Sequence, residues 1–127
     1  MNNIICLWSC PRNLSTALMY SFAQRNDVEV FDEPLYAHYL KTTGVLHPLR
    51  KKVLNSLDNN GDMVVQKVIL KKSHKISFHK LMTHFLIGLN RDFLLKVSNI
   101  IFVRKPEEII ASYSKIINNP TLDDIGL

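Results

Sequence analysis

Short apolar runs alternate along the chain with stretches of helical spacing. The runs have the length and continuity of strands covered on both faces of a parallel sheet. They are residues 4–8, 28–31, 63–70 and 99–103. Apolar side chains recur every three or four residues in the intervening stretches, which is typical of helices that cover a sheet. These stretches are residues 13–25, 35–40, 46–58, 71–90, 91–97 and 106–117. The alternation predicts an α/β fold with three layers, α/β/α, and a parallel sheet of about four strands joined by right-handed crossovers.

The turn after the first run carries the polar side chains expected of an anion site. Arg12, Asn13, Ser15 and Thr16 lie where a strand ends and a helix begins. Unpaired backbone N–H groups and the positive end of the helix dipole converge at such a helix start. An arginine and two hydroxyls add to that attraction, so we interpret the turn as a cradle for a phosphate- or sulfate-like anion.

Charged side chains also follow the second and fourth runs. Asp32 and Glu33 come directly after the second run, and Arg104 comes directly after the fourth. Ligands of open α/β sheets bind at the carboxyl ends of the strands, so these residues are expected at the edge that carries the anion cradle. Ser112, on the next helix, leans back toward the helix start and can donate to a phosphate beside Arg104. Taken alone, Asp32 and Glu33 fit a solvated turn or helix cap as well as they fit a ligand site. Taken alone, Arg104 fits a salt-bridged surface residue better than it fits a ligand site.

Lys67 interrupts the third apolar run, residues 63–70. A lysine buried in a strand is costly unless an anion pairs with it, so this position is a candidate for a functional cation. A lysine at the edge or end of a strand can instead reach water through its long stem. The two interpretations carry equal weight.

Composition limits the class of protein. The 127 residues fit one domain, and 46% hydrophobic with 21% charged residues is ordinary for a globular protein. No apolar run approaches the roughly 18–20 residues of a membrane-spanning helix, and the N-terminus lacks the basic start of a secretory signal, so we expect a cytoplasmic protein. The net charge of +5 is scattered without interleaved aromatic residues, which disfavours nucleic acid. Histidine and cysteine spacings predict no metal site.

Two segments resemble ligand-binding motifs of sulfotransferases. Residues 9–16, SCPRNLST, look like their 5'-phosphosulfate-binding loop, and residues 103–113, from VRKP to SY, look like their 3'-phosphate-binding motif. Residues 11–40 as a whole are similar to a bacterial sulfotransferase-like group within the P-loop nucleoside triphosphatase superfamily. The resemblance covers nearly the entire chain. It implies that residues 1–127 form a single, partial domain, the amino-terminal part of a typical family domain. Independently of the resemblance, residues 121–127 read as the capped start of a further helix, so the chain is expected to be truncated at its carboxyl end.

The resemblance implies 3'-phosphoadenosine 5'-phosphosulfate as sulfuryl donor and a hydroxyl or amine of a small molecule as acceptor. Arg12 would then hold the phosphosulfate and stabilise charge on the leaving phosphate. Arg104 and Ser112 would grip the 3'-phosphate, which distinguishes this donor from ATP. The remaining donor-binding residues carried over from the motif are Asn13, Leu14, Ser15 and Thr16.

Catalytic roles follow from the same resemblance. Glu33 would be the general base that takes the acceptor's proton, with Asp32 as a competitor for that role. Lys67, in the expected third strand, would neutralise charge on the transferred sulfuryl group. In-line transfer of this kind needs the two substrates to be positioned and cationic side chains to be near the transferred group, rather than a metal ion. We expect no nucleic-acid or membrane partner, and a homodimer is left open.

Departures from the family pattern keep two alternatives in view. Leu14 stands where the commoner motif has glycine, so this loop cannot freely use a positive φ there. Arg12 stands where many members have lysine, which exchanges a point charge for a fork of donors. One alternative is a P-loop nucleotide-dependent phosphotransferase, although the G-x-x-x-x-G-K-[ST] sequence is absent. The other is a non-catalytic nucleotide- or anion-binding module.

Overall fold

The computed structural model, which describes residues 3–121 and 124, contains a four-stranded parallel sheet. The strands are β1 (Ile4–Ser9), β2 (Val28–Asp32), β3 (Ile76–Met82) and β4 (Ser98–Ile101), in the order β2-β3-β1-β4. Each neighbouring pair is parallel, so all carboxyl ends share one edge of the sheet. The predicted α/β fold and the number of strands are therefore confirmed.

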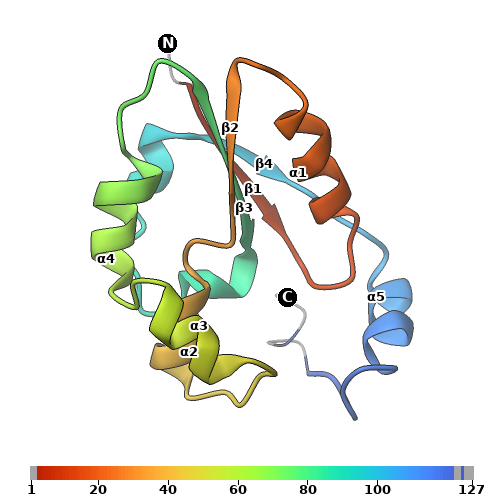
Figure 1. Cartoon of the computed structure of the whole chain (residues 1–127). Helices are drawn as coiled ribbons and strands as arrows, with labels where there is room; N and C mark the ends of the chain where they lie inside the picture. The colour runs from red at the N-terminus through yellow and green to blue at the C-terminus, as the bar shows by residue number, and fades with distance from the viewer. Residues whose placement is uncertain (1–2, 122–123, 125–127) are drawn as a thin grey trace.

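Helices lie on both faces of the sheet (Figure 1). The α-helices are α1 (Ser15–Ala23), α2 (Tyr36–Thr43), α3 (Arg50–Ser56), α4 (Gly61–Val64) and α5 (Pro106–Tyr113). A π-helix η1 (Val65–Ile69) continues α4, and two 3-10 helices are η2 (Thr83–Leu86) and η3 (Asp92–Lys96). Pro106 begins α5 with Glu107 and Glu108 in its first turn, as the sequence predicts, because proline fits the first helical position and acids favour the positive helix end.

The core is divided between the two faces of the sheet because side chains alternate along each strand. On one face, Leu7 and Phe78 pack against Met19 of α1. On the other, Trp8 packs in a larger cluster with α2 and α4, which includes Tyr39 and Val64. This two-sided burial explains why β1 is an unbroken apolar run.

The third strand lies in a different segment from the one predicted. Residues 63–70 form α4 and η1, whereas β3 comes from residues 76–82, inside the stretch predicted to be a helix. In η1, Ile69 is buried while Lys67 is exposed, so the apolar run covers only one side of a helix. The helix predicted over residues 71–90 is wrong, because β3 occupies residues 76–82 and the helix found in this stretch is the single-turn η2.

The fourth strand is where the sequence predicts it, but the prediction that it is buried is wrong. All four residues of β4 are exposed, because β4 is an edge of the sheet and pairs only with β1. The predicted start of a further helix falls mostly outside the described residues. Within them, the Asp124 carboxylate accepts hydrogen bonds from both the backbone N–H and the hydroxyl of Thr121, at 2.8 Å each, as in a helix cap. Among the described residues, no helix is long and apolar enough to cross a membrane.

Candidate active site

The loop between β1 and α1 changes direction at Arg12. Its φ of 58° lies in the left-handed region, which is unusual for a residue other than glycine. Leu14 has a φ of −80° and directly precedes α1, and its backbone N–H donates to the Asn13 side chain at 2.9 Å. The positive φ that glycine would supply at position 14 is therefore not needed there, because the turn is made two residues earlier. Ser15 is buried and Thr16 exposed at the start of α1.

The structure brings three of the predicted donor-binding residues, Arg12, Arg104 and Ser112, into direct contact. Arg12 Nε donates a hydrogen bond to Ser112 Oγ at 2.9 Å, and Arg104 Nη1 donates to the backbone oxygen of Arg12 at 2.6 Å. Arg104 Nε also contacts the Glu108 carboxylate at 3.1 Å. Asn13 Nδ2 donates to the Phe102 carbonyl at 3.2 Å, which ties the loop to the chain just beyond β4. We call Arg12, Arg104 and Ser112 the arginine clamp.

A buried lysine and two carboxylates lie at the carboxyl ends of β2 and β3. Asp32 is opposite Lys80 in the strand register, and Lys80 Nζ lies 3.1 Å from both Asp32 Oδ1 and Glu33 Oε1. The Lys80 side chain is 6% exposed, Glu33 23% and Asp32 53%. Glu33 has a φ of 51°, and its backbone N–H donates to the Lys80 carbonyl at 2.9 Å. We call these three residues the lysine–carboxylate cluster.

Burial and the ion pairs together set the acidity of this cluster. Burial raises the pKa of Glu33 above its usual value, and the nearby Lys80 ammonium offsets only part of that effect. Burial alone would lower the pKa of Lys80, but the two carboxylates more than compensate, so its pKa is raised. Lys80 is therefore charged near neutral pH, and Glu33 is a stronger base than an exposed glutamate.

Lys67 does not occupy the strand in which a catalytic lysine was expected. It lies on the exposed side of η1, so the structural premise for its role is wrong. Lys80 has the features predicted for Lys67: it is a lysine buried in a strand with anionic partners. Sequence reasoning missed it because residues 76–82 include a serine and a histidine beside the lysine and do not read as an apolar run. The signal that could have located this lysine is its position near the end of residues 76–82, together with the acidic pair Asp32 and Glu33 at the end of another strand.

Aromatic residues extend the site from Glu33 along α2. Tyr36, three residues after Glu33, shares a 2.8 Å hydrogen bond with His47 Nδ1 and stacks on Phe85 with ring centroids 5.5 Å apart. Burial, followed by the charge of Glu33, raises the pKa of Tyr36 to about 12. Burial lowers the pKa of His47, so its ring is neutral near pH 7. Tyr36 is thus a neutral hydrogen-bonding side chain beside the candidate base.

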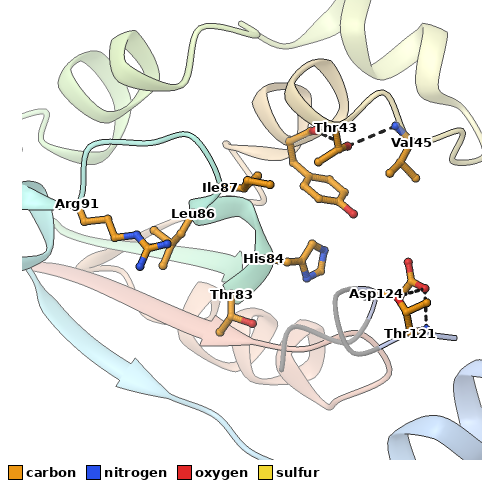
Figure 2. A pocket seen from close by; sticks show the side chains of 10 residues that line it. Thr43, Val45, Thr83, His84, Leu86, Ile87, Arg91, Thr121 and Asp124 are labelled. Carbon is orange, nitrogen blue, oxygen red and sulfur yellow. Dashed lines mark hydrogen bonds between the residues drawn. The ribbon is translucent and has the colours of Figure 1, made fainter.

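A pocket of about 760 Å³ lies between α2 and η2 (Figure 2). We call it the α2–η2 pocket. It is lined by Tyr39, Thr43, Val45, Thr83, His84, Leu86, Ile87, Arg91, Thr121 and Asp124. Figure 2 shows Arg91 beside Leu86 at one end and Asp124 beside Thr121 at the other, with His84 between them. The pocket is large enough for a small organic molecule. Among residues 3–121 and 124, no cluster of three or more histidine, cysteine or acidic residues could hold a metal ion.

Comparison with known proteins gives a match along the chain. Residues 2–127 match the family described as sulfotransferase domain. Two curated proteins from Arabidopsis thaliana, branched-chain-amino-acid aminotransferase-like proteins 1 and 2, are each 42% identical over 127 residues, covering 98% of this chain and 22% of each relative. The chain thus spans about a fifth of the length of these relatives, whose names describe the longer proteins. No solved structure matches the chain significantly.

Proposed function

The chain belongs to the sulfotransferase domain family, and we propose that it transfers a sulfuryl group from 3'-phosphoadenosine 5'-phosphosulfate to a hydroxyl or amine of a small-molecule acceptor. The observation that carries this proposal is the arginine clamp. Its three residues come from two segments about ninety positions apart, and hydrogen bonds of 2.9 Å and 2.6 Å hold them together. A site with two guanidinium groups and a helix start suits a ligand with more than one anionic group.

The clamp would hold the two charged ends of the donor. Arg12, at the start of α1, would contact the 5'-phosphosulfate together with the backbone N–H groups of residues 13–16 and the hydroxyls of Ser15 and Thr16. Arg104 and Ser112 would contact the 3'-phosphate. Glu108 and the Arg12 carbonyl already orient the Arg104 guanidinium, which lowers the entropy lost when an anion binds.

The lysine–carboxylate cluster would carry out the transfer. A new bond forms between the acceptor oxygen or nitrogen and sulfur, while the bond from sulfur to the 5'-phosphate oxygen breaks and adenosine 3',5'-bisphosphate leaves. Glu33, with its raised pKa, takes the acceptor's proton. Lys80, rather than Lys67, supplies positive charge near the transferred group, and Arg12 stabilises the leaving phosphate. Asp32 is the more exposed carboxylate and helps hold Lys80 in place.

Turnover in a Glu33→Gln variant tests the assignment of the base. Formation of adenosine 3',5'-bisphosphate is followed with the donor and a panel of simple phenols, alcohols and amines. We expect Glu33→Gln to lower turnover by a factor of about 100 or more, while stabilisation by added bisphosphate is retained. Glu29→Gln, which alters an exposed carboxylate in β2, the strand that ends just before Glu33, is the matched control. Unchanged turnover in Glu33→Gln would show that another group is the base.

Thermal shifts separate the proposed donor from the phosphotransferase alternative. The wild-type chain is expected to be stabilised by adenosine 3',5'-bisphosphate more than by magnesium-ATP at the same concentration, because only the bisphosphate offers a 3'-phosphate to Arg104 and Ser112. A preference for magnesium-ATP would contradict the sulfotransferase proposal. Binding of the bisphosphate without any turnover across the acceptor panel would favour a non-catalytic nucleotide-binding module.

A further inference from the structure

The α2–η2 pocket is built from the two segments that directly follow the lysine–carboxylate cluster. Helix α2 begins three residues after Glu33, and η2 begins three residues after Lys80. Side chains of the two segments pack together, since Tyr39 meets the His84 ring edge-on with centroids 4.7 Å apart. Tyr36, whose pKa responds to the charge of Glu33, stacks on Phe85 of η2. The pocket is thus formed by the chain immediately beyond the candidate base, while Glu33 itself is not among its lining residues.

We propose that the α2–η2 pocket binds the acceptor, and that the acceptor is an amphipathic molecule whose apolar body ends in a carboxylate held by Arg91. This inference rests on the proposed sulfuryl transfer, and it adds the pocket, the chemical class of the acceptor and a residue that selects it. The group to be sulfated lies at the end of the molecule that faces Glu33.

The lining of the pocket defines the apolar part of this acceptor. Val45, Leu86, Ile87 and the ring of Tyr39 form apolar surface. Ile87 is 48% exposed, so part of its apolar surface is open to a molecule in the pocket. An aromatic or aliphatic body would bury this surface and remove it from water, which is the usual driving force for binding in such pockets.

Arg91 and Asp124 are the charged residues among those that line the pocket, and they differ in availability. Asp124 Oδ2 already accepts two hydrogen bonds of 2.8 Å from Thr121, so it acts as a local cap. The guanidinium of Arg91 makes no ion pair with any of the described residues. A guanidinium beside apolar surface matches a carboxylate in charge and in its two parallel donors. The lining therefore favours an anionic end group over a cationic one.

Three phenols that differ only in their end group test this inference. They are 3-(4-hydroxyphenyl)propionate, its neutral primary amide and tyramine, and their affinities are measured by calorimetry in the absence of donor. We expect the carboxylate to bind wild type about tenfold more tightly than the amide, and tyramine to bind more weakly than either. Arg91→Met should reduce the preference for the carboxylate to within about twofold, and Arg91→Lys should retain part of it. Lys72→Met, which removes an exposed charge just before β3, should leave it unchanged.

Equal affinity for acid and amide in wild type, or a preference that survives Arg91→Met, would overturn the inference. The thermal shift with adenosine 3',5'-bisphosphate is measured on the same samples, because it reports on the donor site independently. Stabilisation by the bisphosphate without a carboxylate preference would leave the proposed function standing and remove only the acceptor class. A carboxylate preference without any response to the bisphosphate would overturn the pocket's role in sulfuryl transfer.

Discussion

His79 is expected to make the fold sensitive to acid. It lies in β3 between Cys6 of β1 and Phe31 of β2, and its side chain is fully buried. The ring stacks on Phe31 with centroids 4.7 Å apart, and neither ring nitrogen has a hydrogen-bond partner among the described residues. Burial lowers the pKa of His79 from 6.5 to about 4. The informative substitution is His79→Leu, which replaces the imidazole by an apolar side chain of similar volume.

The magnitude follows from the difference in pKa between the folded and unfolded chain. Between pH 6.5 and 4 the unfolded chain binds a proton at His79 that the native state does not, so the free energy of unfolding falls as the pH falls. Across this whole titration of His79, the free energy of unfolding falls by about 3 kcal/mol, and about 2 kcal/mol of this fall occurs between pH 7 and pH 5. At pH 7, His79→Leu should change the free energy of unfolding by less than about 1.5 kcal/mol, because lost ring stacking opposes the removal of unpaired polar atoms.

Urea unfolding at pH 7, 6 and 5 measures this effect. The free energy of unfolding of His79→Leu is expected to rise relative to wild type by about 2 kcal/mol as the pH falls from 7 to 5. His74→Leu, which changes an exposed histidine just before β3, is the control and should run parallel to wild type. Parallel curves for wild type and His79→Leu would refute the reasoning, because they would mean that His79 titrates alike in both states.

Three further predictions concern the site and the packing of α4. Lys80→Met should lower the free energy of unfolding at pH 7 by roughly 1–3 kcal/mol in urea titrations, with a smaller loss near pH 4, because Glu33 and Asp32 would lose their shared cation. In a pH profile of kcat/KM, activity should fall on the acid side with a midpoint above pH 4.5, the pKa of an ordinary glutamate, because the pKa of Glu33 is raised. Any activity that remains in Lys80→Met should have this midpoint at a still higher pH, because the ammonium that lowers the pKa of Glu33 is gone. A midpoint that the substitution leaves unchanged would argue against Glu33 as the base. Gly61→Ala should lower the free energy of unfolding by about 2 kcal/mol in thermal or urea unfolding, because a Cβ there would lie 2.5 Å from His38 Nδ1 and 2.8 Å from Leu89 Cδ1.

The donor loop and the last helix could be predicted because local signals specify them. A continuous apolar strand followed by hydroxyls marks the β1–α1 turn, and Pro106 followed by two acids marks the start of α5. The contacts within the arginine clamp could not be predicted, since Arg12 and Ser112 are a hundred residues apart and meet only through sheet topology. The left-handed backbone of Arg12 was also hidden, because nothing in its residue type requires it.

The exchange of helix and strand between residues 63 and 82 has a physical cause. Periodicity reports how side chains meet water, and β3 is buried by partners that lie far away in the sequence. Lys80 is charged yet buried because Asp32 and Glu33 pair with it, and His79 is polar yet fully enclosed. A central strand with such residues looks like a polar segment in the sequence. Conversely, Val64 and Ile69 form one buried side of a helix that local spacing does not distinguish from a strand.

The recognition of a 3'-phosphate by the arginine clamp is the central claim, and one comparison of ligands tests it most directly. The thermal shift is measured with adenosine 3',5'-bisphosphate and with adenosine 5'-phosphate, in wild type, Arg104→Ala and the control Arg25→Ala, which removes an exposed arginine paired with Asp27. The bisphosphate should stabilise wild type and the control more than the monophosphate does. In Arg104→Ala the two shifts should become equal. Equal shifts in wild type, or a bisphosphate preference that persists without Arg104, would contradict the account.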